Sequence, residues 1–145
     1  MKKALLLIMS FMFMLSPVSS NVPEKVIITD NGGGSIILFE RIVGDHRRLK
    51  TPVEFKGLCA SACTLFLTLP EEQLCIHPTG ILLFHNVYRW QGMNKVPLPE
   101  NTRRFVEKLP FWVQEYLNNK GGLVELGWIV MTYEYASQHM RTCKA

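Results

Sequence analysis

From residue 25 onward, the apolar and polar residues follow two different periods. The β-branched run 25–30 and the alternating run 53–58 predict strands, in which successive side chains point to opposite faces. Between residues 36 and 48 the apolar residues recur at helical spacing, and Ser35 is suited to cap that helix. A second apolar helix is predicted over 63–69. The first half of the chain therefore alternates strand and helix.

Further along, the pattern predicts two short strands, a loop and three helical segments. Residues 74–76 form a brief strand, and the run 81–84 is apolar throughout, which is typical of a strand buried on both faces. The polar stretch 86–99 contains two prolines and predicts a loop. Three segments are predicted to be helical: 100–119, where Pro110 forces a kink or a break, then 123–131 and 132–140.

This order of elements predicts an α/β fold with a mostly parallel sheet and C-terminal helices. In such sheets, functional sites form at the carboxyl ends of the strands. Three features follow predicted strands directly: the glycine loop 32–34, Ser61 and His85. We therefore expect these three features to meet at one edge of the sheet.

The composition indicates a single folded domain, and the first 20 residues indicate where the protein is located. The 145 residues are 48% hydrophobic and 19% charged, which suits one domain and excludes a disordered chain. Lys2 and Lys3 precede an apolar run over 4–15, and small residues follow up to Ser20. This is the pattern of a secretory signal peptide, residues 1–20, leaving a single domain over 21–145. We expect a periplasmic or secreted protein without membrane association once the signal is cleaved.

Charge and motifs narrow the set of partners. Cleavage removes Lys2 and Lys3, which lowers the formal net charge from +4 to +2. The arginine pairs 47–48 and 103–104 are isolated, so no basic stripe predicts a nucleic-acid partner. The sequence has neither a G-x-G-x-x-G motif nor a P-loop, so no cofactor is predicted.

The predicted export bears on the redox state of the four cysteines. In an oxidising compartment an even number of cysteines favours disulfides, and three pairings of Cys59, Cys63, Cys75 and Cys143 are conceivable. A zinc site built from the first three of them and a histidine is the alternative. The spacing of Cys59 and Cys63 differs from the usual C-x2-C pattern, so we predict no metal.

Ser61 and His85 are suited to nucleophilic hydrolysis. Such chemistry needs a hydroxyl, a base for its proton and N–H donors for the oxyanion. Ser61 lies at a strand-to-helix turn between two alanines, where the N–H of Ala62 and the glycine loop could supply donors. His85 ends a strand 24 residues later. The alternatives are that Ser61 is only a helix N-cap, His85 a hydrogen-bonded core histidine and the glycines a flexible turn.

The segment Gly57-Leu58-Cys59-Ala60-Ser61-Ala62-Cys63-Thr64, followed by Leu83-Phe84-His85, resembles the proteolytic subunit of Clp protease and its small exported relatives. The resemblance to this ClpP/crotonase superfamily covers about residues 25–90. It implies an abridged form of that fold, a peptide or protein substrate and homo-oligomeric assembly. It also implies roles for four residues: Ser61 as nucleophile, His85 as base, and Gly33 and Ala62 as oxyanion donors.

The chain departs from the family at the third catalytic residue. The family has an aspartate after its long helix, whereas both aspartates here, Asp30 and Asp45, precede Ser61. Glu125 and Glu134 are the carboxylates available in that region. We therefore expect a serine hydrolase, a peptidase, with a Ser–His dyad or an incomplete triad. The alternatives are a catalytically inactive module that binds a peptide or protein partner, and a structural protein without a ligand.

The cysteines also suggest a pairing. Cys59 and Cys63 flank Ser61 at −2 and +2, and a sharp turn can bring such positions within bridging range. We hypothesise the bridges Cys59–Cys63 and Cys75–Cys143. The second would close a loop of 68 residues, which in the chain-entropy model is worth roughly 4 kcal/mol.

Overall fold

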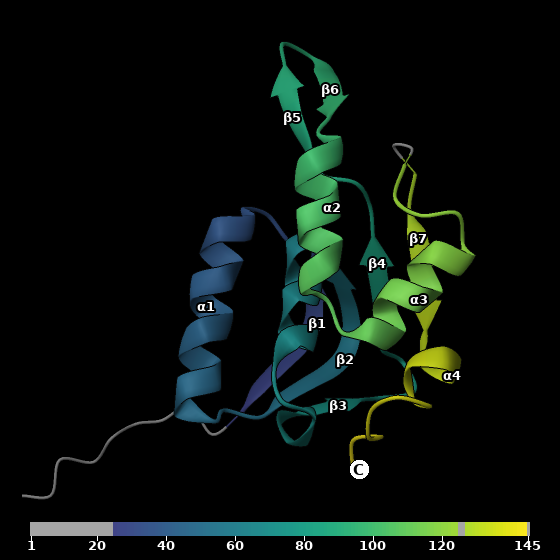
Figure 1. Cartoon of the computed structure of the whole chain (residues 1–145). Helices are drawn as coiled ribbons and strands as arrows, with labels where there is room; N and C mark the ends of the chain where they lie inside the picture. Colours follow the sequence, from purple (N-terminus) through teal and green to yellow (C-terminus); the bar gives the residue numbers. More distant parts are fainter. Residues whose placement is uncertain (1–24, 125–126, 145) are drawn as a thin grey trace, which may run out of the picture.

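The computed structural model describes residues 25–124 and 127–144, and it has an α/β fold with a mostly parallel central sheet, as predicted (Figure 1). Strand β2 has β1 on one side, and β3 and β4 share its other side, all in parallel. Strand β7 adds to β4 in the antiparallel direction. The strands of this sheet are β1 (Val26–Asn31), β2 (Val53–Ala60), β3 (Leu74–Ile76), β4 (Ile81–Phe84) and β7 (Ile129–Thr132).

The first helix begins after the predicted cap, Ser35, and ends at Leu49, one residue beyond the predicted range. The hydroxyl of Ser35 accepts a hydrogen bond from the Leu38 N–H at 3.4 Å, and Lys50 closes the helix with φ = 53°. Pro110 divides the predicted 100–119 helix into two. The helices are α1 (Ile36–Leu49), the 3-10 helices η1 (Ser61–Thr68) and η2 (Glu71–Gln73), α2 (Pro99–Lys108), α3 (Phe111–Asn119) and α4 (Tyr133–Ala136).

The core lies between the sheet and these helices. Phe55, Phe84 and Met131 come from three different strands and are fully buried. Helix α1 packs on η1, where the rings of Phe39 and Phe66 meet edge to face with centroids 6.2 Å apart. Burial of apolar side chains from both layers is the main stabilising contribution in a fold of this size.

The predicted loop 86–99 and the predicted helix 63–69 differ in type from the observed elements. The stretch 86–99 contains a β-hairpin of β5 (Tyr88–Gln91) and β6 (Asn94–Pro97), which projects beyond the rest of the molecule (Figure 1). Its two-residue turn contains Gly92 at φ = 62°, a conformation that suits glycine. The predicted helix 63–69 is the 3-10 helix η1, which begins two residues earlier.

The predicted helix 123–131 is also wrong. Residues 129–132 form β7, whose Ile129 pairs with Phe84 and whose Thr132 pairs with Ile81. Short apolar runs do not distinguish helix from strand, and pairing with the free edge of β4 decides the outcome here. Strand β4 is not buried on both faces: Ile81 is 39% exposed, and burial alternates along the strand.

The predicted signal peptide, residues 1–20, and Glu125 lie outside the described residues. Across the described ranges, no helix is long and apolar enough to cross a membrane.

Candidate functional site

The carboxyl ends of β1, β2 and β4 bring the three predicted features together. The glycine loop 32–34, Ser61 and His85 all line one cavity of about 470 Å³. Because β1 and β4 both run parallel to β2, their ends open on the same edge of the sheet. The remaining lining residues are Ile36, Ala62, Asn86, Val87, Tyr88, Trp90, Phe105 and Trp128.

Ser61 has a strained backbone and a free hydroxyl. Its φ is 56°, in the left-handed region that residues other than glycine rarely adopt. The N-cap of η1 is Ala60, and no side chain caps that helix, so Ser61 is not the N-cap considered from the sequence. The Ser61 hydroxyl makes no hydrogen bond to any residue that the structure describes. Cavity-facing strain of this kind is typical of functional residues.

The Cys59–Cys63 disulfide closes the turn that carries Ser61. The two Cα atoms lie 5.4 Å apart and both cysteines are fully buried. The second bridge joins Cys75 to Cys143. Both bridges are those hypothesised from the sequence, and the alternative zinc site from Cys59, Cys63 and Cys75 is not formed.

Gly33 packs directly against the Ser61 turn. A Cβ atom on Gly33 would lie 2.5 Å from the Ala60 carbonyl oxygen and 2.8 Å from the Ser61 Cβ. The φ of Gly33, 82°, is also one that favours glycine. Glycine is therefore required here to let the loop after β1 approach the turn after β2.

The two predicted oxyanion donors differ in whether their N–H groups are already hydrogen-bonded. The N–H of Gly33 already donates to the side-chain oxygen of Asn31 at 2.9 Å. The N–H of Ala62 lies in the first turn of η1, before any intrahelical acceptor, so it is available to a ligand in the cavity. The Ala62 N–H is thus the predicted donor that remains available to a ligand, whereas the Gly33 N–H is already bound by the Asn31 side chain.

His85 is held by its own neighbour rather than by a carboxylate. Its Nδ1 lies 2.5 Å from the backbone oxygen of Asn86. Since a carbonyl oxygen only accepts, Nδ1 is the donor in this contact, and in the neutral imidazole the lone pair then lies on Nε2. The ring of Trp128 meets the imidazole edge to face at 4.5 Å, and Tyr88 lies 5.4 Å away. No hydrogen bond joins His85 to Ser61.

Glu134 does not approach His85. Strand β7 is antiparallel to β4, so Thr132 pairs with Ile81 at the start of β4, and Glu134 follows Thr132 there. His85 follows Phe84 at the other end of β4. A hydrogen bond with the Thr132 side chain lowers the pKa of the Glu134 carboxyl, which makes Glu134 part of its own helix start. No carboxylate is found among the described residues that line the cavity.

Asn86, Tyr88 and Trp128 were missed by the sequence analysis. Asn86 is 2% exposed, and its side-chain amide has no hydrogen-bond partner within the described chain. Tyr88, Trp90 and Trp128 line the cavity, and the last two are more than half exposed. The hairpin and β7, whose types were mispredicted, are the elements that place them there.

Comparison of the chain with protein-family models and with curated proteins gives no match.

Proposed function

We propose that the protein is an exported serine hydrolase that acts on peptides, with Ser61 as nucleophile and His85 as base. The observation that carries the proposal is a strained serine, whose hydroxyl has no partner among the described residues, sharing one cavity with a histidine whose Nδ1 is bound by a backbone carbonyl. We also propose that the fold is a member of the ClpP/crotonase superfamily. The order of strand, glycine loop, strand, serine turn, strand and histidine supports it.

In the proposed reaction, each proton transfer has a named donor and acceptor. Nε2 of His85 takes the Ser61 proton as Oγ attacks the peptide carbonyl carbon, and the Ala62 N–H donates to the oxyanion. The imidazolium is stabilised by the Asn86 carbonyl through Nδ1. His85 then gives its proton to the leaving amine, and water repeats the sequence to release the acyl group. Since Ser61 and His85 are not yet hydrogen-bonded, the imidazole must turn toward Ser61 when substrate binds, as catalytic hydrogen bonds often tighten only then.

The residues that line the cavity favour a substrate segment that is uncharged and apolar. The described lining residues include no aspartate, glutamate, lysine or arginine, while Ile36, Phe105 and the aromatic wall of Tyr88, Trp90 and Trp128 contribute apolar surface. An apolar wall with few polar groups favours side chains of the same character. We expect cleavage beside aromatic or large aliphatic residues.

The second candidate function is a peptide-binding module without catalysis. Two observations favour it: no hydrogen bond joins Ser61 to His85, and the Gly33 N–H is occupied by Asn31. A backbone carbonyl also stabilises an imidazolium less than a carboxylate does. Loss of the carboxylate's role costs about 10⁴-fold in kcat in a serine protease, so slow turnover is expected even if the site is active.

Cleavage of a defined peptide mixture tests the proposal. Disulfide-intact protein lacking residues 1–20 is incubated with synthetic peptides, and new termini are identified by mass spectrometry. The proposal predicts cuts beside apolar residues that disappear in Ser61→Ala and persist in Ser137→Ala, which changes the residue that follows α4. Peptide binding without cleavage would support the binding module instead. Equal cleavage by Ser61→Ala would overturn the assignment of Ser61.

A further inference from the structure

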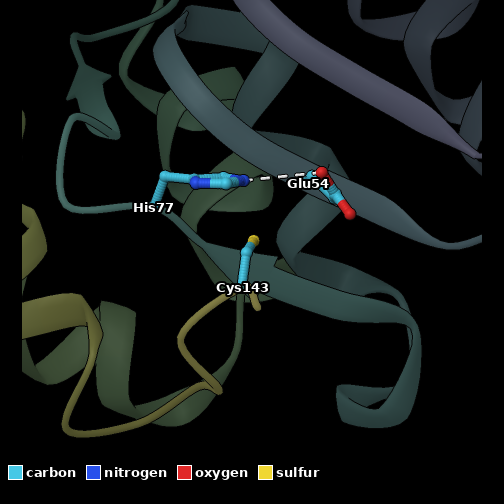
Figure 2. Close-up of side chains that lie close together, drawn as sticks. All are labelled: Glu54, His77 and Cys143. Atoms are coloured by element: carbon cyan, nitrogen blue, oxygen red, sulfur yellow. Dashed lines mark hydrogen bonds and ion pairs between the residues drawn. The ribbon is translucent and has the colours of Figure 1, made fainter. Parts of the chain in front are cut away.

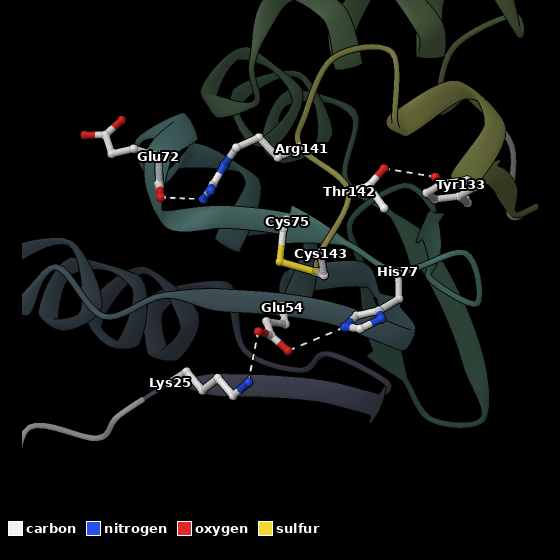
Figure 3. Close-up of a disulfide and its surroundings, with 9 residues drawn as sticks. All are labelled: Lys25, Glu54, Glu72, Cys75, His77, Tyr133, Arg141, Thr142 and Cys143. Atoms are coloured by element: carbon white, nitrogen blue, oxygen red, sulfur yellow. Dashed lines mark hydrogen bonds and ion pairs between the residues drawn. A yellow bond between two sulfur atoms is a disulfide. The ribbon is translucent and has the colours of Figure 1, made fainter. Parts of the chain in front are cut away.

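A second cluster of metal-ligating side chains lies at the start of β2, away from the Ser61 cavity. Glu54 comes from β2, Cys75 from β3, His77 from the loop after β3 and Cys143 from the C-terminal segment. One ligand atom each from Glu54, His77 and Cys143 lies within 4.8 Å of the others. Figure 2 shows the Cys143 sulfur pointing toward the Glu54–His77 pair. Cys75 is not among these three residues, but its sulfur is bonded to that of Cys143 (Figure 3).

The backbone holds these positions without help from the disulfide. Glu54 and Cys75 are direct partners in the β2–β3 pairing. The His77 N–H donates to the Phe55 carbonyl at 2.9 Å. The Cys143 N–H donates to the Ile76 carbonyl at 3.0 Å, so the C-terminal segment continues the sheet beside β3. None of these backbone contacts involves a sulfur, so they can persist when the bridge opens.

We propose that reduction of the Cys75–Cys143 bridge creates a tetrahedral zinc site of two thiolates, the His77 imidazole and the Glu54 carboxylate. Thiolate, imidazole and carboxylate are the ligands that Zn²⁺ takes in proteins, and four is its usual number in a closed site. His77 Nε2 and Glu54 Oε2 face each other at 3.4 Å, and a metal ion would replace that contact.

The charges around the cluster fit a divalent cation. Two thiolates and one carboxylate carry three negative charges, and zinc leaves one of them uncompensated. Lys25 offsets that charge, because its Nζ donates to Glu54 Oε1 at 3.1 Å while the other oxygen, Oε2, faces His77 (Figure 3). Lys25 would then orient the carboxylate ligand from outside, as partners of ligating groups commonly do.

The two disulfides differ in their access to a reductant. Cys59 and Cys63 are fully buried, whereas Cys75 is partly exposed near the C-terminal segment. A small dithiol reaches the Cys75–Cys143 bridge first. Its thiolate attacks one sulfur to give a mixed disulfide, and its second thiol releases the protein. The dithiol is oxidised by two electrons to a disulfide, and Cys75 and Cys143 become thiols. Zinc binding then releases two protons from them.

Zinc coordination would thus replace the Cys75–Cys143 disulfide as the link between β3 and the C-terminal segment. The oxidised chain holds its C-terminal segment to β3 through the bridge, and the reduced chain would hold it through the metal. This inference is independent of the proposed hydrolase: neither Ser61 nor His85 takes part, and it concerns the other end of β2.

Zinc binding in the two redox states tests this inference. The folded protein is reduced anaerobically with a dithiol, freed of reductant by desalting and titrated with Zn²⁺ against a chromophoric chelator. Thiols are counted with and without denaturant. We expect one zinc per reduced chain and none per oxidised chain. Cobalt in place of zinc should give the thiolate charge-transfer and tetrahedral d–d absorption bands.

Matched variants distinguish the four-ligand site from a pair of thiols. Glu54→Gln and His77→Ala should each weaken zinc binding about tenfold or more, the range measured for perturbed metal sites. Glu72→Gln and His139→Ala, which change the same residue types elsewhere, should bind as the wild type does. Equal affinity in all four variants, or no zinc on the reduced wild type, would overturn the inference.

Folding is followed in the same samples by thermal melting of the reduced chain. Zinc should raise the melting midpoint of the reduced wild type and of the two control variants, and raise it less in Glu54→Gln and His77→Ala. A reduced chain that zinc neither stabilises nor refolds would also overturn the inference.

Discussion

At the residue scale, the site depends on two backbone conformations that side chains disfavour. Ser61 adopts φ = 56° and Gly33 adopts φ = 82°, and the two positions are in direct contact. The buried Cys59–Cys63 bridge holds the first of them in place. The chain thus keeps a strained serine at the rim of a cavity, where its hydroxyl has no hydrogen-bond partner within residues 25–124 and 127–144.

Relieving the strain at Ser61 should stabilise the protein. We expect Ser61→Gly to raise the free energy of unfolding by about 0.5–1 kcal/mol, because glycine lacks the Cβ that is disfavoured at positive φ. Ser137→Gly, at φ = −69°, should instead lower it by a similar amount. Urea denaturation of both variants measures these changes. A less stable Ser61→Gly protein would mean that the turn stores no strain.

Adding a methyl group at Gly33 should have the reverse effect. Gly33→Ala places a Cβ against the Ala60 carbonyl at a disfavoured φ, so we expect a loss of about 2–3 kcal/mol in unfolding free energy. Gly32→Ala is the matched control, because nothing lies within 4 Å of its added Cβ. If urea denaturation finds the two variants equally stable, the loop does not pack on the Ser61 turn.

At the residue level the sequence supplied much of the site, and its omissions have a physical reason. Ser61, His85 and the glycine loop are recognisable because each follows a strand. The Asn86 carbonyl that orients His85 has no side-chain signature, since every residue has a backbone oxygen. The Asn31 side chain that occupies the Gly33 N–H is likewise set by local turn geometry.

At the element scale, the first half of the chain follows its sequence pattern and the second half is decided by tertiary contacts. The parallel strands β1 to β4 and helix α1 are all recognisable from periodicity and caps. The hairpin β5–β6 and strand β7 are not, because their runs are short and β7 forms by pairing with the edge of β4. These two elements supply Tyr88, Trp90 and the neighbourhood of Trp128, so the cavity wall could not be predicted with the catalytic residues.

Truncations along β7 test its strand geometry. Met131 is fully buried, and Met131→Ala should cost about 2–5 kcal/mol of unfolding free energy through the cavity it leaves. Its neighbour Val130 is 47% exposed on the other face, and Val130→Ala should change stability by less than about 1 kcal/mol. Denaturation curves that show equal losses for both would contradict the alternation of faces.

At the scale of the whole molecule, two disulfides serve a small domain in different ways. The Cys59–Cys63 bridge acts locally on the turn of Ser61, and the Cys75–Cys143 bridge joins residues 68 positions apart. Small domains bury a limited fraction of their surface, so such a long-range tie matters to their stability. Disulfides of this kind suit an oxidising compartment.

Removal of the long-range bridge should destabilise the protein strongly. In the absence of zinc, Cys75→Ser with Cys143→Ser should lower the free energy of unfolding by about 4 kcal/mol, mostly by freeing the unfolded chain. Urea denaturation without reductant measures the change against the wild type. A loss below about 1 kcal/mol would mean that the bridge restricts the unfolded chain far less than the chain-entropy model expects.

The most direct test of the central claim is the rate at which a fluorophosphonate labels Ser61 in the disulfide-intact protein. The account predicts a single adduct on Ser61 and a rate at least about 100-fold lower in His85→Ala, the typical contribution of a general base. His139→Ala, which removes a histidine stacked on Trp112, should react as the wild type does. No adduct between pH 6 and 9, or labelling that is unchanged in His85→Ala, would contradict the account.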